Sequence, residues 1–109
     1  MKVMGNIWIE GKHGAFIGVG RMKLLERIKE HGSITVAARS MKMSYRQAWE
    51  LVDSMNRESS KPLVVTAAGG IGGGGTVVTT EGEKAIKHYK QLFARFEKFT
   101  DKETTKLKV

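Results

Sequence analysis

The sequence predicts a mainly α-helical α+β fold, and three observations support this prediction. Residues 32–57 carry two helical patterns that are separated by only a short turn. Two β-prone segments flank a glycine-rich stretch at residues 69–75, and a long amphipathic pattern occupies residues 81–100. This order is typical of a winged helix-turn-helix, in which a β-hairpin wing follows the second helix of the pair.

An N-terminal β-hairpin is expected before the helices. Residues 3–10 are apolar and β-prone, above all at three consecutive positions: Ile7, Trp8 and Ile9. After a Gly-Lys-His-Gly turn, residues 15–17 supply the second strand. Trp8 is more often a packing anchor than a platform for a ligand, so we interpret it as a contact with the core or with a second copy of the chain.

The first helix is predicted at residues 21–31, where apolar side chains recur with helical spacing: Leu24, Leu25 and Ile28. Gly32 is expected to end this helix, because glycine readily adopts the left-handed conformation that closes a helix. The basic side chains of the other face are interpreted as solvated: Arg21, Lys23, Arg27 and Lys29.

Two further helices follow, and each begins with a serine. Ser33 can cap the second helix, whose apolar stripe consists of Ile34, Ala37, Ala38 and Met41. Lys42 and Met43 make the turn. Ser44 then opens the third helix, where Gln47 completes a capping box. The inner face of the third helix is expected to contain Tyr45, Ala48, Trp49, Val52 and Met55.

The outer face of the third helix is the candidate DNA-binding surface. In a helix-turn-helix, the N-terminal residues of the second helix contact base edges in the major groove. Arg46 can bond O6 and N7 of guanine, Gln47 can bond N6 and N7 of adenine, and Ser44 at the helix N-terminus suits a phosphate. The alternative is that Arg46 and Gln47 are ordinary solvated residues on a surface helix.

Residues 69–75 contain six glycines, and four interpretations of them compete. A Walker A loop requires lysine after the last glycine, where this sequence has Thr76. Three of the glycines match a dinucleotide fingerprint, but that motif requires a following helix, and here a Val-Val strand follows. A flexible linker and a wing tip that approaches DNA closely remain, and the flanking strands favour the wing. Since residues 63–79 carry no charged side chain, such a wing would contact DNA through backbone groups and threonine hydroxyls.

A last helix is predicted from Glu81 to about Thr100, opened by a capping box of Thr80 and Glu83. Its apolar stripe consists of Ala85, Ile86, Tyr89, Leu92, Phe93, Phe96 and Phe99. This stripe is wider than one small core requires, which favours pairing with a second copy. Residues 80–100 are therefore expected to form a dimerisation helix, and the polar residues 101–109 to fray.

Composition limits the classes of function. The 109 residues are expected to form a single domain, and their net charge of +8 suits nucleic acid or an acidic surface. The absence of cysteine excludes disulfides, thiolate metal sites and cysteine nucleophiles. No secretory signal and no apolar run of about 20 residues is visible, so a soluble cytoplasmic protein without a membrane partner is expected.

The histidines do not indicate catalysis or a metal site. His13, His31 and His88 are scattered without the spacing of metal ligands, and no carboxylate pair or nucleophile–base pattern accompanies them. We therefore expect no enzyme activity, no cofactor and no metal.

With these elements placed, the chain resembles the DNA-binding domain of the molybdate-responsive ModE-type regulators, a LysR-like winged helix-turn-helix. The resemblance covers roughly residues 7–96 and rests on GRMKLLERIKEHGSITVAARSMKMSYRQAWELVDSMN, on GGIGGGG and on TTEG. It implies a homodimer on a palindromic site, held partly by the N-terminal strands and the last helix. The family's recognition-helix positions correspond to Ser44, Tyr45, Arg46 and Gln47, and its wing corresponds to residues 69–75.

The sequence departs from the family at its C-terminal end. Full-length members carry C-terminal oxyanion-binding domains that sense molybdate, whereas this sequence stops at Val109. The resemblance therefore implies a role in molybdenum metabolism, but direct binding of molybdate as an effector is not expected.

We expect a sequence-specific transcriptional regulator that binds double-stranded DNA as a homodimer. The alternative is a small oxyanion-binding or protein-interaction module that uses the glycine-rich tip. The expected DNA-binding residues are Ser33, Thr35, Ser44, Tyr45, Arg46, Gln47, Glu50, Gly69, Gly70, Gly72, Gly73 and Thr76. The expected dimer contacts are Ile7, Trp8, Ile9, Tyr89, Leu92, Phe93 and Phe96.

Overall fold

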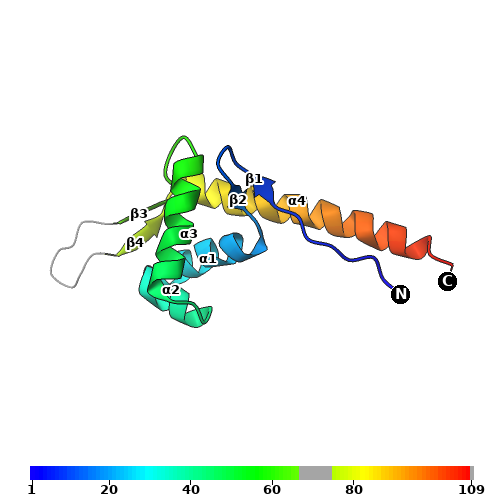
Figure 1. Cartoon of the computed structure of the whole chain (residues 1–109), viewed down its shortest axis with the longest axis horizontal. Coiled ribbons are helices and arrows are strands. Elements are labelled where there is room, and N and C mark those ends of the chain that lie inside the picture. Colours follow the sequence, from blue (N-terminus) through cyan, green and yellow to red (C-terminus); the bar gives the residue numbers. More distant parts are fainter. Residues whose placement is uncertain (67–74, 109) are drawn as a thin grey trace.

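The computed structural model describes residues 1–66 and 75–108 of the chain (Figure 1). Its helices are α1 (Val19–His31), α2 (Ile34–Ser40), α3 (Tyr45–Glu58) and α4 (Thr80–Thr105). Its strands form two antiparallel pairs, β1 (Ile9–Glu10) with β2 (Ala15–Ile17) and β3 (Val64–Thr66) with β4 (Thr76–Val78). The predicted class, α+β and mainly α, is confirmed for this part of the chain.

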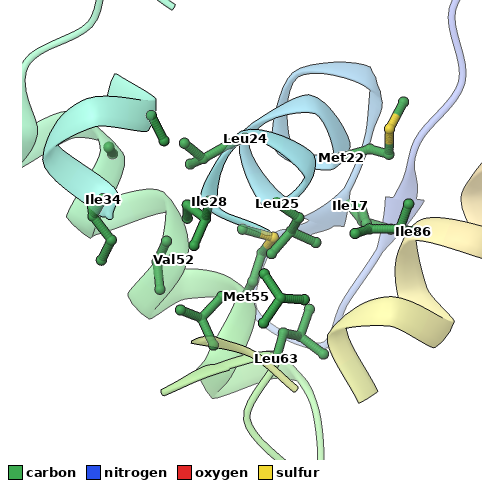
Figure 2. Packing of buried hydrophobic residues seen from close by; sticks show 14 of the residues in the cluster. Ile17, Met22, Leu24, Leu25, Ile28, Ile34, Val52, Met55, Leu63 and Ile86 are labelled. Carbon is green, nitrogen blue, oxygen red and sulfur yellow. The ribbon is translucent and has the colours of Figure 1, made fainter. Parts of the chain in front are cut away.

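One apolar core lies between α1, α2, α3, the strand pairs and the first turns of α4. Leu25 and Ile28 of α1 are fully buried and lie against the side of α3 that carries Met55 (Figure 2). Ala37 and Ala38 are buried in α2, where their small side chains let the neighbouring helices approach closely. Truncating a fully buried leucine in such a core costs about 2–5 kcal/mol, so this packing fixes how α2 and α3 lie against α1.

Local sequence signals determine the helix ends around α2. Gly32 has a φ of +66° and closes α1 in the left-handed conformation. The Ser33 hydroxyl accepts a hydrogen bond from the Val36 N–H at 3.1 Å, and Ser44 and Gln47 make both bonds of the capping box. Each side-chain cap contributes about 1 kcal/mol to helix stability. These predicted helix ends are confirmed.

The N-terminal strand is shorter than predicted. Only the two residues of β1 pair with β2, because the residues before them lie along α4 instead (Figure 1). The Val3 N–H donates to Thr104 Oγ1 at 2.9 Å, and the Tyr89 hydroxyl donates to the Ile7 carbonyl at 2.7 Å. The backbone groups of Val3 and Ile7, which lie in the predicted strand, are thus bonded to side chains of α4 instead of to β2.

Helix α4 differs from its prediction at both ends. Thr79 rather than Thr80 is the N-cap, and its hydroxyl accepts from the Gly82 N–H at 3.1 Å. The helix continues through Thr105 instead of ending near Thr100. The hydroxyls of Thr100, Thr104 and Thr105 bond to carbonyls of the preceding turn, and Thr104 is also tied to the N-terminal segment. These bonds satisfy polar groups in a stretch that was expected to fray.

The molecule is elongated, with principal extents of 63 × 28 × 21 Å. Most of α4 projects away from the other helices, with the N-terminal segment beside it, so the two termini lie near each other at one end (Figure 1). Within residues 1–66 and 75–108, no helix combines the length and the apolar character that crossing a membrane requires.

Candidate nucleic-acid interface

The first turns of α3 face solvent while the helix is held from behind. Ala48, Val52 and Met55 are buried against the other helices and anchor its inner face. Lys42, with a φ of +57°, forms the turn that leads from α2 into the capped start of α3. The predicted base-reading and phosphate-binding positions of this helix are all exposed: Ser44, Tyr45, Arg46, Gln47 and Glu50. The structure therefore places these five residues together on one accessible surface.

The outward face of α3 carries two exposed ion pairs. Arg46 Nε lies 3.2 Å from Glu50 Oε1, and Arg57 Nη1 lies 3.1 Å from Asp53 Oδ2. The Arg46 side chain is 88% exposed, and exposed pairs of this kind contribute only about 0.3–0.5 kcal/mol. Arg46 can therefore exchange Glu50 for another acceptor at little cost. The two ion pairs together carry no net charge.

Two residues of the predicted inner face of α3 are not buried. Tyr45 is 53% exposed and Trp49 is 48% exposed, because the apolar face that contacts the core is narrower than the sequence stripe. Trp49 lies on the side of α3 that faces β3, where it lines a groove with Asp53, Asn56 and Thr66. Trp49 thus borders the space between α3 and the β3–β4 hairpin.

Asn56 fixes the position of the β3–β4 hairpin relative to α3, a role that the sequence did not indicate. Its Oδ1 accepts from the N–H groups of Leu63 and Val64 at 2.8 and 3.2 Å, and its Nδ2 donates to the Val64 carbonyl at 2.9 Å. One side chain therefore satisfies three backbone groups at the start of β3. Asn56 lies in the last turn of α3, some way before the loop that contains Pro62, and no local sequence pattern predicts these bonds.

The other end of the hairpin is fixed by backbone and threonine contacts. The Thr76 N–H donates to the Gly32 carbonyl at 2.9 Å, which ties β4 to the end of α1. The Thr79 hydroxyl donates to the carbonyl of Pro62 at 2.7 Å. A Cβ on Gly82 would collide with the Leu63 carbonyl, so glycine is required where α4 passes the hairpin. These contacts give a physical reason for the TTEG sequence.

The remaining predicted DNA-binding residues divide into three groups. Ser33 is half-buried and its hydroxyl is already used as the α2 cap, whereas Thr35 is exposed on α2. Thr76 is half-buried in β4. Gly69, Gly70, Gly72 and Gly73 lie outside the described residues.

The β1–β2 turn is attached to the end of α3 through Glu58. The Glu58 carboxylate accepts from the N–H groups of Lys12 and His13, each at 2.7 Å, and lies 3.4 Å from His13 Nδ1. A Cβ on Gly11 would collide with this carboxylate. No local sequence pattern connects this turn with α3, because the two segments are more than 40 residues apart.

Arg21 is also placed differently from its prediction. It was interpreted as part of a solvated face of α1, but it is half-buried, and its Nη1 donates to Ser54 Oγ of α3 at 3.0 Å. The reason is that Arg21 lies in the first turn of α1, where the helix crosses α3. A basic residue thus lies directly beside the candidate surface.

The predicted dimer residues lie along α4 and the segment beside it. Tyr89 is fully buried within the single chain, so its side chain is part of the core and offers no surface to a partner. Ile7, Ile9, Leu92, Phe93 and Phe96 are half-buried, and Trp8 is 57% exposed. The rings of Phe93, Phe96 and Phe99 follow one another with centroid distances of 6.0 and 6.5 Å, and Phe99 is 57% exposed.

Burial also affects the ionisation of Tyr89. Removal from water raises the pKa of its phenol above the ordinary value, because the charged form is disfavoured.

In residues 1–66 and 75–108, no group of three or more histidine, aspartate or glutamate side chains is arranged to hold a metal ion.

Known proteins related to this chain include two that are named for molybdenum and one that is named as a DNA-binding regulator. The chain is 37% identical to the molybdenum transport protein ModE of Azotobacter vinelandii over 94 residues, which are 86% of this chain and 35% of that protein. It is 42% identical to the molybdenum-pterin-binding protein MopB of Rhodobacter capsulatus over 76 residues, 70% of this chain and 28% of that protein. It is also 42% identical to the DNA-binding transcriptional dual regulator ModE of Escherichia coli over 69 residues, 63% of this chain and 26% of that protein.

The similarity is to one part of these longer proteins. The chain spans about a quarter to a third of the length of the relatives that it matches, and no family model matches it. At 37–42% identity over most of its residues, it is nevertheless a sequence relative of the ModE and Mop proteins. None of the three names is that of an enzyme.

Proposed function

We propose that the chain is a winged helix-turn-helix DNA-binding domain of a transcriptional regulator. In this assignment α3 is the recognition helix, α2 the positioning helix and β3–β4 the wing. The observation that carries the proposal is the outward face of α3. Its capped N-terminus presents Ser44, Arg46 and Gln47 to solvent beside a hairpin that Asn56 holds in place.

Each exposed side chain has a role in this proposal. Arg46 contacts guanine in the major groove, while the N-terminus of α3 with Ser44 binds a phosphate. Gln47, whose Oε1 accepts from the Ser44 N–H at 3.3 Å, gives up this long capping bond when it contacts adenine. Trp49 faces the groove between α3 and the wing, and Tyr45 is exposed in the first turn of α3, so both rings are available for apolar contact with thymine methyl groups. Glu50 releases Arg46 when the base contact forms.

We further propose that the regulator acts as a homodimer on a palindromic site. Two recognition helices would enter successive major grooves about 34 Å apart. The distal half of α4 and the N-terminal segment are the proposed contact between the copies. The exposed rings of Phe99 and Trp8 and the half-buried Phe96 support this assignment, because apolar side chains on a projecting helix are covered by association.

A role in molybdenum metabolism is proposed from the relatives. Two of the three are named for molybdenum, and the third is named as a DNA-binding regulator. MopB is named as a molybdenum-pterin-binding protein, which raises a second candidate function, the binding of a molybdenum compound by the chain itself. Calorimetric titration with molybdate, tungstate and sulfate tests this candidate, and we expect no saturable heat with any of them.

The proposed function is tested by selecting binding sites from a random duplex pool with the purified protein. We expect enrichment of a palindromic sequence with half-sites one helical turn apart, and much weaker binding to a scrambled duplex of the same composition. An Arg46→Ala, Gln47→Ala double variant serves as the control and should enrich no sequence. Failure of the wild-type protein to enrich any sequence would contradict the proposal.

A further inference from the structure

Positive charge near the recognition helix lies beside α3 rather than on its outward face. On that face, Arg46 and Arg57 are balanced by Glu50 and Asp53. The wing contributes no charge either, since residues 63–79 contain no charged side chain. A DNA duplex presents about one negative charge per 1.7 Å of its axis, so a protein that binds it needs cations at the edges of the contact.

Arg21 provides such a cation on the flank of α3 opposite to the wing. Asn56 and Trp49 border the wing side of α3, whereas Arg21 is bonded to Ser54 on the other side. Its side chain lines an open groove together with Gln47 and Glu50, which belong to the outward face. In the part of the chain that the structure describes, Arg21 has no ion-pair partner.

Lys12 extends the same flank toward the C-terminal end of α3. The Glu58 carboxylate holds the β1–β2 turn through the N–H groups of Lys12 and His13 and faces the His13 ring. Because Gly11 has no Cβ, the turn can approach this carboxylate closely at the end of α3 (Figure 1). The Lys12 side chain itself is exposed, and no carboxylate of residues 1–66 or 75–108 forms an ion pair with it.

We propose that Arg21 and Lys12 bind the phosphate backbone of DNA along the flank of α3 opposite to the wing. The inference rests on the proposed DNA binding and adds the residues that hold the duplex in register. Such contacts fix the orientation of the recognition helix but carry no sequence information. Glu58 acts as a positioning residue, because it holds the turn that carries Lys12.

The test compares Arg21→Ala, Lys12→Ala and the double variant with Lys23→Ala, which removes an exposed lysine of the same helix as Arg21. Binding to the selected duplex and to a scrambled duplex is measured over a series of salt concentrations. We expect each flank variant to lose roughly fivefold to tenfold in affinity for both duplexes. The slope of log affinity against log salt should fall by about 0.9 for each phosphate contact removed per subunit.

Further variants separate charge from folding. Arg21→Lys should keep most of the salt slope, and Lys23→Ala should bind like the wild type. An unchanged salt slope in both flank variants, with the wild type still selecting its site, would overturn the flank contact and leave the proposed function intact. Equal losses in Lys23→Ala would overturn it as well, because they would indicate diffuse attraction. Absence of DNA binding by the wild type would overturn both proposals.

Discussion

Arg46 connects the sequence, the structure and the proposed function at the scale of a single residue. The Ser44 capping box fixes the start of α3 at Tyr45, one residue before Arg46. With the helix starting there, the Arg46 side chain lies on its outward face. Its only ion pair among the described residues is the exposed one with Glu50. A weak pair of this kind keeps the guanidinium oriented without competing strongly with a base.

Replacing Arg46 by alanine should cost about 1–3 kcal/mol on the selected site, because a bidentate contact with guanine is lost. Binding to scrambled DNA should change far less. Competition titrations with both duplexes measure the difference, with Arg27→Ala on the exposed face of α1 as the matched control. An equal loss on both duplexes would show that Arg46 contacts only the phosphate backbone.

Tyr89 predicts how the stability of the fold depends on pH. Burial raises its pKa, so the folded state holds the phenol proton more tightly than the unfolded chain, in which the pKa is about 10. The stabilisation is therefore complete below about pH 10 and is lost as the pH rises through the folded-state pKa.

The free energy of unfolding, measured by urea titration between pH 8 and 11, should thus fall above about pH 10. Tyr89→Phe lacks the hydroxyl that bonds to Ile7 and should be less stable at pH 8, but its stability should fall less steeply above pH 10. Parallel pH profiles for the two proteins would contradict the assignment.

At the scale of elements, α3 is attached to its neighbours by single polar side chains at defined places. Asn56 ties it to β3, Ser54 receives Arg21 from α1, and Glu58 holds the β1–β2 turn. Helix α3, the proposed recognition helix, is therefore connected both to the β3–β4 hairpin and to the N-terminal hairpin. A change in any of these three residues should alter how the flanking elements lie along DNA.

Replacing Asn56 by alanine leaves the N–H groups of Leu63 and Val64 without their acceptor. We expect the free energy of unfolding to fall by about 1–3 kcal/mol, because partly buried donors would lose their bonds. Chemical denaturation of the variant and of Asn6→Ala, an exposed asparagine, measures this cost. If the two variants were equally stable, Asn56 would not hold the hairpin.

Features that depend on residues close together in the sequence could be predicted, whereas contacts between distant segments could not. The caps at Ser33 and Ser44 were predicted because each cap is formed by residues three positions apart. Burial of Trp49 was predicted wrongly, because helical spacing gives the direction of a side chain but not the extent of the neighbouring core. The bonds of Glu58 and Arg21 join distant segments, and no local pattern encodes them.

At the scale of the whole molecule, α4 and the N-terminal segment form a projecting arm. Its inner half is fixed to the core by Tyr89 and Ile86, while Phe99 and Trp8 leave apolar surface in solvent. The segment beside α4 is held by few bonds, chiefly from Val3 and Ile7. An arm of this kind gains stability when a second copy covers it.

We therefore expect a dimer in sedimentation equilibrium at micromolar concentration. Phe99→Ser should shift the equilibrium toward monomer, because it removes an exposed ring from the projecting part of α4. Lys98→Ser, an exposed neighbour on the same helix, serves as the control. A wild-type protein that sediments as a monomer would contradict the proposed assembly.

The most direct test of the proposed interface is to follow the backbone amide resonances of the labelled protein while the selected duplex is added. The largest shifts are expected at residues 44–50, with smaller ones at Lys12 and Arg21. The groove between α1 and α4, where Lys29 is paired with Glu83 and Lys90 with Glu26, should change little. Shifts concentrated in that groove, with residues 44–50 unaffected, would contradict the assignment of α3 as the recognition helix.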